Sequence, residues 1–238
     1  KTFCSAREYE YLLPSYCLRP ARPAGADPDA DAVPLSAAEL ARLASLLRDL
    51  QGTHSFHNFT DKGKLAASDK SATRYLYAVF AGEQISLRGQ SYVPLRYHGQ
   101  SFILHQIRKM TGLVTAIMRG VAPPDAIGRA VAAPRVTPIP LSPACALVMC
   151  RSLYANYEKR RPAGRASVHF DDLAGEQRAF MADEIWPSVA SAEAEGEFSR
   201  FAQAVDAYRF DECALARPPH GAEVGPEQSP EHAEELGS

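Results

Sequence analysis

One helix-forming stretch, residues 98–120, constrains the fold of this chain more than any other. Small residues, Gly112 and Ala116, lie on one side of it, where another element can pack closely. We therefore predict a central helix buried on two sides, with Ser101 as its N-cap and Gly120 as a left-handed stop. The apolar residues on the other side recur at alternating spacings of four and three, the pattern of an amphipathic helix, and are Ile103, Ile107, Met110, Val114 and Ile117.

Arg108 lies beside this apolar stripe when successive residues of the helix are placed 100° apart. A guanidinium held near the protein body favours a carboxylate or a phosphate as its partner. The pattern leaves an alternative open, in which the apolar stem of Arg108 covers the flank of the helix and its charge stays in water. The spacing therefore makes Arg108 a candidate functional residue without assigning its role.

The composition of the 238 residues is that of a soluble globular protein with one large domain or two small ones. The formal net charge of −2 gives no global attraction to nucleic acid, although residues 74–165 are basic and residues 171–238 are acidic. The 5 cysteines form no CxxC pair, so neither a disulfide framework nor a zinc knuckle is predicted, and a reducing compartment is indicated. We find no apolar run of membrane-spanning length and no signal peptide, and we expect no membrane partner.

The remaining patterns predict an α+β fold, an antiparallel sheet flanked by helices. Alternation predicts a strand over residues 3–13, with Pro14 ending it. Residues 73–80 and 92–98 have the pattern of a hairpin with a long connection, which leads into the central helix. Later and flanking elements are predicted as a helix capped by Ser36 and reaching residue 50, a short helix at 125–131, an apolar strand at 145–149, a basic loop at 156–165 and helices at 172–186 and 193–208.

Two histidines, His54 and His57, lie three residues apart in the stretch GTHSFHNFT. This spacing suits metal ligands on a helix, but a third ligand is lacking, so we predict no metal site. We interpret the stretch as a loop that Phe56 and Phe59 anchor, with polar residues bonded to the backbone.

Four motifs in register resemble the tRNA pseudouridine synthase A family, and its eukaryotic members in particular. They are SAREYEYLLPSY, GTHSFHNFT, GQSFILHQIRKMTGLV and PIPLSPACALVM, and the likeness covers about residues 3–208. The resemblance implies a pseudouridine synthase-like fold and the isomerisation of uridine to pseudouridine in RNA, with no cofactor and no metal. In that reaction the N-glycosidic bond breaks, the uracil turns, and its C5 becomes bonded to C1′ of the ribose.

The family's catalytic aspartate lies in an Arg-Thr-Asp-x-Gly motif, which this sequence lacks. The stretch Thr60-Asp61-Lys62-Gly63 imitates it, but no arginine precedes it and it follows GTHSFHNF, so we give Asp61 no catalytic role. We expect the chain to be a C-terminal portion of a longer enzyme, with the aspartate upstream, and to be inactive alone. The main alternative is a non-catalytic RNA-binding protein that kept the fold; a structural protein without an RNA partner is a third.

The resemblance carries three active-site roles over to this chain. Tyr9 matches the tyrosine that stacks on the target uracil and helps to move the C5 proton. Arg108 matches the arginine that pairs with the catalytic aspartate, and Leu147 matches an apolar residue that closes the uracil pocket. The family usually has Gly-Leu where this chain has Ala146-Leu147. The candidate phosphate contacts are Arg74, Arg96, Lys109, Arg119, Lys159, Arg160 and Arg161.

The expected organisation has five parts. They are residues 1–19, a strand completing the catalytic core; 20–35, a flexible insertion; 36–158, the catalytic and RNA-binding domain; 159–216, a helical extension; and 217–238, a disordered acidic tail. We expect tRNA as the partner, with messenger RNA or small nuclear RNA as further substrates, and a monomeric protein. The expected location is the nucleus, with the mitochondrion or the cytoplasm as alternatives.

Overall fold

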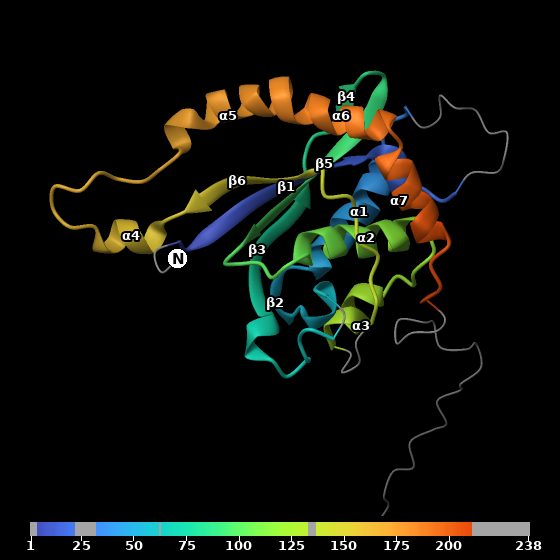
Figure 1. The fold of residues 1–238 in the computed structure, drawn as a ribbon, viewed down its shortest axis with the longest axis horizontal. Helices are drawn as coiled ribbons and strands as arrows, with labels where there is room; N and C mark the ends of the chain where they lie inside the picture. Colours follow the sequence, from blue (N-terminus) through green and yellow to red (C-terminus); the bar gives the residue numbers. More distant parts are fainter. Residues whose placement is uncertain (1–3, 22–31, 62, 133–136, 211–238) are drawn as a thin grey trace, which may run out of the picture.

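An antiparallel sheet with helices on both faces organises the chain (Figure 1). The structure is a computed structural model and describes residues 4–21, 32–61, 63–132 and 137–210. The strands are β1 (Ala6–Pro14), β2 (Gly52–Ser55), β3 (Thr73–Ala81), β4 (Ile85–Leu87), β5 (Gln90–Gly99) and β6 (Leu147–Leu153). The helices are α1 (Ala37–Asp49), α2 (Gln106–Met118), α3 (Ala126–Ala132), α4 (Ala155–Arg160), α5 (Ala174–Phe180), α6 (Trp186–Ala194) and α7 (Glu197–Asp206). This architecture confirms the predicted α+β class.

The strands of the sheet follow the order β2-β3-β5-β1-β6, and β4 pairs with β5 outside this path. Every pairing between them is antiparallel. The predicted hairpin is confirmed as β3 and β5, whose long connection holds β4. β1 therefore lies between β5 and β6, where both of its edges are hydrogen-bonded.

Helix α1 begins where the sequence predicts, because Ser36 and Glu39 form a capping box. The backbone N–H of Glu39 donates to Ser36 Oγ at 3.3 Å, and the backbone N–H of Ser36 donates to the Glu39 carboxylate at 2.7 Å. Arg19 Nε also donates to this carboxylate, at 2.8 Å. The Arg19 hydrogen bond is the main reason that the pKa of Glu39 is lowered to about 2.

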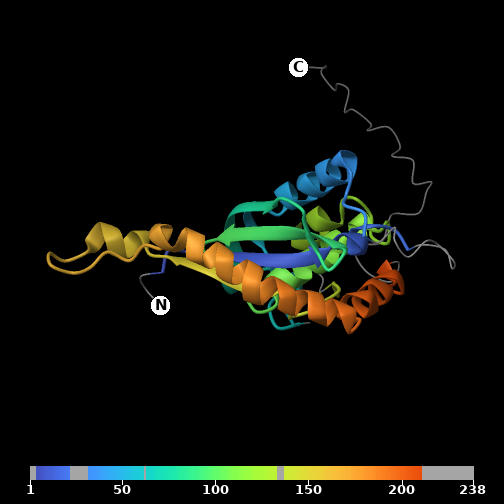
Figure 2. The ribbon, with the colours of Figure 1, turned by 90° about the horizontal axis from the view of Figure 1, so that it is seen from above.

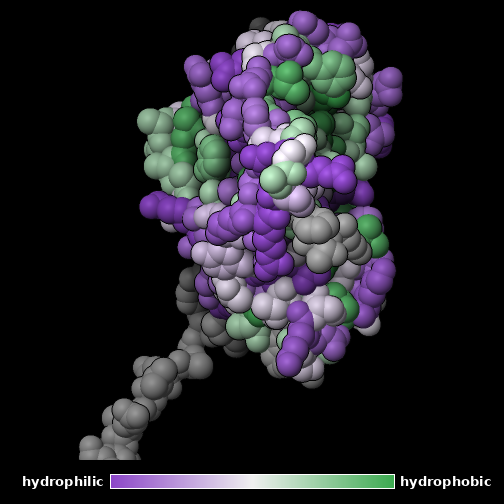
Figure 3. Space-filling model, turned by 90° about the vertical axis from the view of Figure 1, so that its left-hand side faces the viewer, coloured by the Kyte–Doolittle hydropathy of each residue, from purple (hydrophilic) through white to green (hydrophobic). Residues whose placement is uncertain are grey.

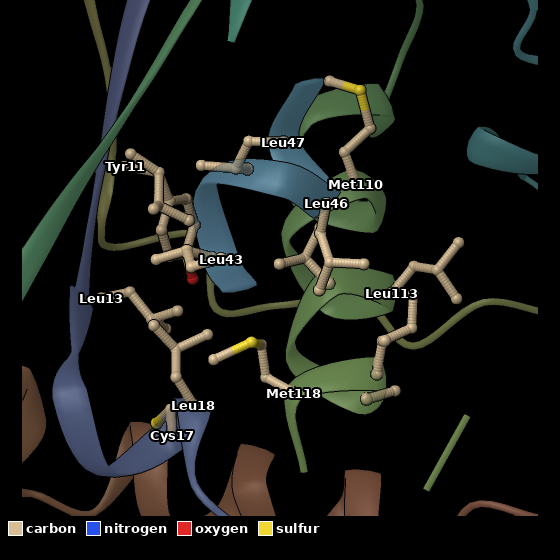
Figure 4. Packing of buried hydrophobic residues seen from close by; sticks show 14 of the residues in the cluster. Tyr11, Leu13, Cys17, Leu18, Leu43, Leu46, Leu47, Met110, Leu113 and Met118 are labelled. Atoms are coloured by element: carbon tan, nitrogen blue, oxygen red, sulfur yellow. The ribbon is translucent and has the colours of Figure 1, made fainter. Parts of the chain in front are cut away.

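Helix α2 is central, as predicted, and its leucine and methionine side chains pack with the leucines of α1 beside β1 (Figure 4). Its start differs from the prediction: Ser101 is not the N-cap, and the helix begins at Gln106 after His105, which has φ 64°. The side chain of Gln106 accepts a hydrogen bond from the backbone N–H of Ile103 at 3.0 Å, so residues 103–106 form a turn before the helix. Gly120 has φ 78°, which confirms the predicted left-handed stop.

Helices α5 and α6 cross the second face of the sheet (Figures 1 and 2), joined by a π-helical stretch, Met181–Ile185. The indole N–H of Trp186 donates to Glu10 of β1 at 3.0 Å. This cover explains why β1 is buried on both faces from Glu10 onward. Pro14 ends the strand as predicted.

Several boundaries in the second half of the chain differ from the predictions. β6 extends from Leu147 to Leu153, and not over 145–149, because its pairing with β1 continues past Met149. The predicted basic loop at 156–165 is wrong in its first part, which is helix α4. The predicted helix at 172–186 is the start of a longer helical run through α6. Most of the predicted insertion at 20–35 and the tail at 217–238 lie outside the described residues.

The GTHSFHNFT stretch forms β2 and a 3₁₀ turn, in which Phe56 and Phe59 are fully buried, as predicted for anchors. His54 Nε2 is 2.7 Å from the carbonyl oxygen of Gln51, and His57 Nε2 is 3.0 Å from the amide nitrogen of Asn58. Across the described ranges, no three His, Cys, Asp or Glu side chains gather as metal ligands, and no helix has the length and apolarity to cross a membrane.

Candidate active site

Tyr9 and Leu147 lie on one face of the sheet, the face that α2 covers. In the pairing of β1 with β6, Tyr9 is opposite Met149 and Tyr11 is opposite Leu147, so their side chains point the same way. The ring of Tyr9 meets that of Phe102 edge-on, with centroids 5.1 Å apart. Since Phe102 lies just before α2, this contact identifies the face.

The segment 142–147 joins α2 to this face of β1. Ser142 donates to the backbone carbonyl of Arg108 from its N–H at 3.3 Å and from its hydroxyl at 2.9 Å, and Arg108 Nε donates back to the Ser142 carbonyl at 2.7 Å. The Tyr11 hydroxyl donates to the carbonyl of the next residue, Pro143, at 2.9 Å. Burial raises the pKa of Tyr11 well above its usual value, which keeps this donor protonated. The segment thus fixes Arg108 relative to β1.

Close packing at Gly112 holds the same segment against α2. A Cβ atom on Gly112 would overlap the carbonyl oxygen of Pro140, so the backbones touch only because Gly112 has no side chain. Ala116, one turn further on, is fully buried. These observations confirm the close approach that the small residues predict. Arg108, one turn before Gly112, is bonded to the same segment through the carbonyl of Ser142.

Every residue of α2 is buried except Arg108. Its Nε is bonded to Ser142, which leaves the two terminal nitrogens of the guanidinium for another acceptor. Among the residues that the structure describes, no carboxylate forms an ion pair with Arg108. The arginine is therefore fixed in position and open to an acidic group that these residues do not supply.

Apolar residues lie near Arg108 and Tyr9 along the chain and across the sheet. Leu147 is half-buried and packs against the core, while Met149, opposite Tyr9 in the sheet, is 54% exposed. Leu104, in the turn before α2, and Leu141, next to Ser142, are also exposed. Burial raises the pKa of the Tyr9 phenol, which is therefore protonated at neutral pH. An aromatic ring with apolar neighbours can take the flat face of a base, and the phenol can exchange a proton.

Lys109 and Arg119 do not lie on the surface, and the structure contradicts their predicted role as phosphate contacts. Each is 8% exposed. Arg119 donates to the carboxylate of Asp206 at 2.6 and 2.5 Å, and Lys109 Nζ donates to the backbone carbonyls of Thr60 and Asn58. Burial lowers the pKa of Lys109. Both cations hold α2 to its neighbours, because a helix buried on two sides leaves them no path to solvent.

The other predicted phosphate contacts are at least partly exposed. Lys159 and Arg160 are exposed on α4, at the end of the molecule that faces the viewer in Figure 3, where hydrophilic residues occupy the middle of the surface. Arg161 pairs with Glu158 at 3.3 Å. Arg74 is half-buried, and burial lowers its pKa. Arg96 is exposed, with its Nε 3.3 Å from Glu10.

Asp61 lies near the start of α2 but does not meet Arg108. Its carboxylate is 3.4 Å from Nε2 of His105 and 3.9 Å from Nζ of Lys64, and it is exposed. The described neighbours of Asp61 are thus His105 and Lys64, and its lack of a catalytic role stays a prediction.

Three residues of the site have roles that the sequence analysis did not predict: Ser142, Pro140 and Phe102. Their contacts depend on how segments distant in the sequence meet, which no periodicity records. All three nevertheless lie within the quoted motifs: Pro140 and Ser142 in PIPLSPACALVM, and Phe102 in GQSFILHQIRKMTGLV.

Comparison with known proteins finds similarity to one family of enzymes. Residues 46–155 match the family described as tRNA pseudouridine synthase. Over 231 residues, which are 94% of this chain and 52% of the relative, the chain is 33% identical to the pseudouridylate synthase 1 homolog of Homo sapiens. Over 182 residues, 74% of this chain and 34% of the relative, it is 36% identical to tRNA pseudouridine synthase 1 of Yarrowia lipolytica.

Residues 46–155 are therefore similar to the tRNA pseudouridine synthase family, which is the family that the four motifs resemble. Its similar relatives carry the names pseudouridylate synthase 1 homolog in Homo sapiens and Mus musculus and tRNA pseudouridine synthase 1 in yeasts. The chain spans about half the length of the first two of them, 52% in each case.

Proposed function

We propose that this chain forms part of an enzyme that isomerises uridine to pseudouridine in tRNA, and that it supplies one side of the active site. The observation that carries the proposal is the joining of Tyr9, Leu147 and Arg108 on one face of the sheet by residues 142–147. The names of the relatives, pseudouridylate synthase 1 homolog and tRNA pseudouridine synthase 1, support the same reaction.

Arg108 pairs with a catalytic aspartate in this proposal. The terminal nitrogens of its guanidinium offer a fork of donors that matches a carboxylate, and the Ser142 carbonyl sets the orientation of that fork. A nearby positive charge keeps the carboxylate ionised and aimed at the ribose. No described carboxylate pairs with Arg108, and residues 1–238 lack an Arg-Thr-Asp-x-Gly segment, so in this proposal the aspartate comes from such a segment outside them and these residues alone are inactive.

Tyr9 and Leu147 hold the uracil. In the reaction, the bond from C1′ to N1 breaks, a bond from C1′ to C5 forms, the hydrogen on C5 leaves as a proton and N1 gains one. A uracil stacked on Tyr9 has its ring beside a protonated phenol, which can take part in that proton transfer. Leu147 closes the pocket with apolar surface, which keeps water away from the detached uracil.

The cations of α4, Lys159 and Arg160, contact phosphates of the tRNA, with Arg74, Arg96 and Arg161 as additional contacts. Phosphate contacts position an RNA without reading its sequence, so messenger RNA and small nuclear RNA remain proposed substrates. A monomeric enzyme and a nuclear location are also proposed, on the resemblance to the eukaryotic members of the family.

The test compares the full-length protein that contains this chain with residues 1–238 alone, each incubated with a tRNA transcript. Mass spectrometry of the digested RNA detects pseudouridine. We expect product from the full-length protein and none from residues 1–238. The full-length Asp61→Asn variant should keep its activity. Product from residues 1–238 would return Asp61 to consideration, whereas an inactive full-length protein that still binds tRNA would favour the non-catalytic RNA-binding alternative.

A further inference from the structure

A row of exposed aromatic side chains lies on β3, on the face of the sheet opposite the candidate active site. Tyr75, Tyr77 and Phe80 are 43%, 45% and 45% exposed, whereas Leu76 and Val79, between them in sequence, are buried. The pleat turns Tyr75 and Tyr77 to the same face, and the register shift between Leu76 and Ala78 brings Phe80 to that face as well. The outer face of an antiparallel sheet is usually polar, so three exposed rings on one strand are not explained by the fold.

His98 of β5 extends this row. Its ring lies 4.8 Å from that of Tyr77 at a tilt of 37°, and Tyr77 meets Tyr75 edge-on with centroids 4.9 Å apart. His98 is opposite Glu8 of β1, and Glu8 alternates with Tyr9, so the row and the site occupy opposite faces. We call Tyr75, Tyr77, Phe80 and His98 the aromatic row.

Helices α5 and α6 do not cover the aromatic row. In Figure 1 they run along the top of the sheet, while β3 descends away from them toward β2. α6 contacts this face at Glu10 of β1, through the indole of Trp186. The rings of β3 are therefore left open to a partner.

The charges beside the aromatic row suit a phosphate backbone. Arg96 lies opposite Phe80 in the sheet, and its side chain is 52% exposed. Lys70 is exposed in the 3₁₀ turn that leads into β3. The carboxylates of this face are neutralised: Glu10 by Arg96, at 3.3 Å, and Glu8 by Arg151, whose Nε is 2.8 Å away. The surface is thus aromatic with cations at its margin.

We propose that the aromatic row stacks unpaired bases of the RNA substrate, as a contact separate from the active site. Sheets with exposed aromatic residues recognise single-stranded RNA by stacking bases on those rings. Side chains two residues apart on a strand are separated by roughly 6.6 Å, which suits successive bases of an extended strand. The choice of RNA as the partner rests on the proposed function; the surface itself does not.

The test uses the full-length protein and a tRNA transcript. In the double variant Tyr75→Ala/Tyr77→Ala, the affinity for tRNA should fall at least about tenfold, because the loss of one stacked base commonly weakens binding roughly 5-fold to 150-fold. Tyr75→Phe/Tyr77→Phe keeps both rings and should bind within about twofold of the wild type. Phe180→Ala on α5, which removes an exposed ring outside the aromatic row, is the matched control and should leave affinity unchanged.

Cross-linking provides a readout that does not depend on the fold of a variant. A tRNA transcript that carries 4-thiouridine, irradiated with the wild-type protein, should form adducts on the peptide of residues 74–80. Wild-type affinity in the alanine variant, or adducts that avoid this peptide, would overturn the proposal. Loss of another protein's binding with tRNA affinity intact would assign the aromatic row to a protein partner and also overturn it.

Activity separates this inference from the proposed function. At saturating enzyme, the single-turnover rate of pseudouridine formation should be the same in Tyr75→Ala/Tyr77→Ala and the wild type, since the row does not reach the reacting uridine. A wild-type protein that makes no pseudouridine but cross-links through β3 would refute the proposed function alone. An active enzyme without cross-links on β3 would refute the inference alone.

Discussion

Helix α2 and residues 155–176, which begin with α4 and which we call the arm, both carry cations that the sequence predicts to be functional. The cations of α2 lie in a buried helix, whereas those of the arm are exposed. In α2 every residue except Arg108 is buried, and the helix is held by Ser142, Pro140 and the carbonyls that bind Lys109. In the arm, residues 159–176 are all exposed. The packing of α2 therefore fixes the position of a charged side chain on it, whereas a charged side chain on the arm can change its conformation.

This difference separates two kinds of function. A group that acts on a reacting bond must be held in position before the substrate arrives, because its effect depends on geometry. A phosphate contact acts mainly through charge, and the affinity for the RNA is the sum of several such contacts. Substitutions in α2 should therefore change rate or stability strongly, and those in the arm should change affinity weakly.

The largest effect is expected for Arg108→Ala in the full-length protein. The catalytic carboxylate would lose its partner in a partly desolvated site, so its pKa would rise and it would be less often ionised. The single-turnover rate of pseudouridine formation should fall on the order of a hundredfold or more, as for the loss of other positioned charged groups. The dissociation constant for tRNA, measured in parallel, should change much less.

Arg108→Lys is the matched control for charge. An ammonium cannot donate to a carboxylate as a bidentate fork while it also holds the Ser142 carbonyl, so the rate should recover only in part. A near-normal rate with weakened tRNA binding in Arg108→Ala would make Arg108 a phosphate contact, and the distinction between α2 and the arm would fail.

Gly112→Ala should destabilise the protein by about 1–3 kcal/mol, the usual cost of overpacking. The new methyl group would overlap the Pro140 carbonyl oxygen, so either α2 or the segment that holds Arg108 must move. Gly128→Ala in α3 is the control, because nothing lies near its Cβ, and it should stabilise by roughly 0.5–1 kcal/mol through helix propensity. Urea unfolding measures both; stabilisation by both substitutions would refute the close contact.

The same contact shows what the sequence could predict. The spacing of small and apolar residues predicted that α2 is buried on two sides and that Gly112 faces a close neighbour. It could not identify Pro140 as that neighbour, because the contact joins segments distant in sequence. The four motifs predicted the similarity to the family. The roles of the site residues stay predictions, and the motifs carry no information on which atoms of Ser142 fix Arg108.

The cations show where prediction from residue type fails. Lys109 and Arg119 were expected at the surface because charged side chains are rarely buried. In the structure, backbone carbonyls and Asp206 satisfy them, and these partners come from other elements. The start of α2 was placed too early for a similar reason: the turn that precedes it depends on Gln106, whose side chain bonds back to Ile103. Residue preferences favoured Ser101 as the N-cap, and they cannot predict the hydrogen bond between Gln106 and Ile103.

Lys109→Met should change how stability depends on pH. Burial lowers the folded-state pKa of Lys109 below the usual value of about 10.4. At pH values between the two pKa values, the unfolded chain therefore binds more protons than the folded protein. The free energy of unfolding of the wild type should therefore rise with pH as it approaches about 10.4, and the variant should lack this contribution. Urea unfolding between about pH 8 and pH 10 measures it. Lys64→Met, at an exposed lysine, should keep the wild-type slope; an unchanged slope in Lys109→Met would show that Lys109 is not desolvated.

The smallest effect is expected in the arm, for Arg160→Gln. Arg160 is exposed on α4, so its loss should remove at most one phosphate contact and should not disturb the site. The slope of log affinity for tRNA against log salt concentration should become shallower by roughly 0.7–0.9, and affinity should fall only a few-fold at low salt. The single-turnover rate at saturating enzyme should stay at the wild-type value, in contrast to Arg108→Ala. Arg178→Gln, an exposed arginine on α5 outside the predicted contacts, provides the control. If Arg160→Gln leaves the salt slope unchanged, α4 does not touch the RNA. If Arg160→Gln lowers the single-turnover rate at saturating enzyme, the arm helps to position the substrate. An exposed cation would then affect the reaction rate, as Arg108 is expected to do.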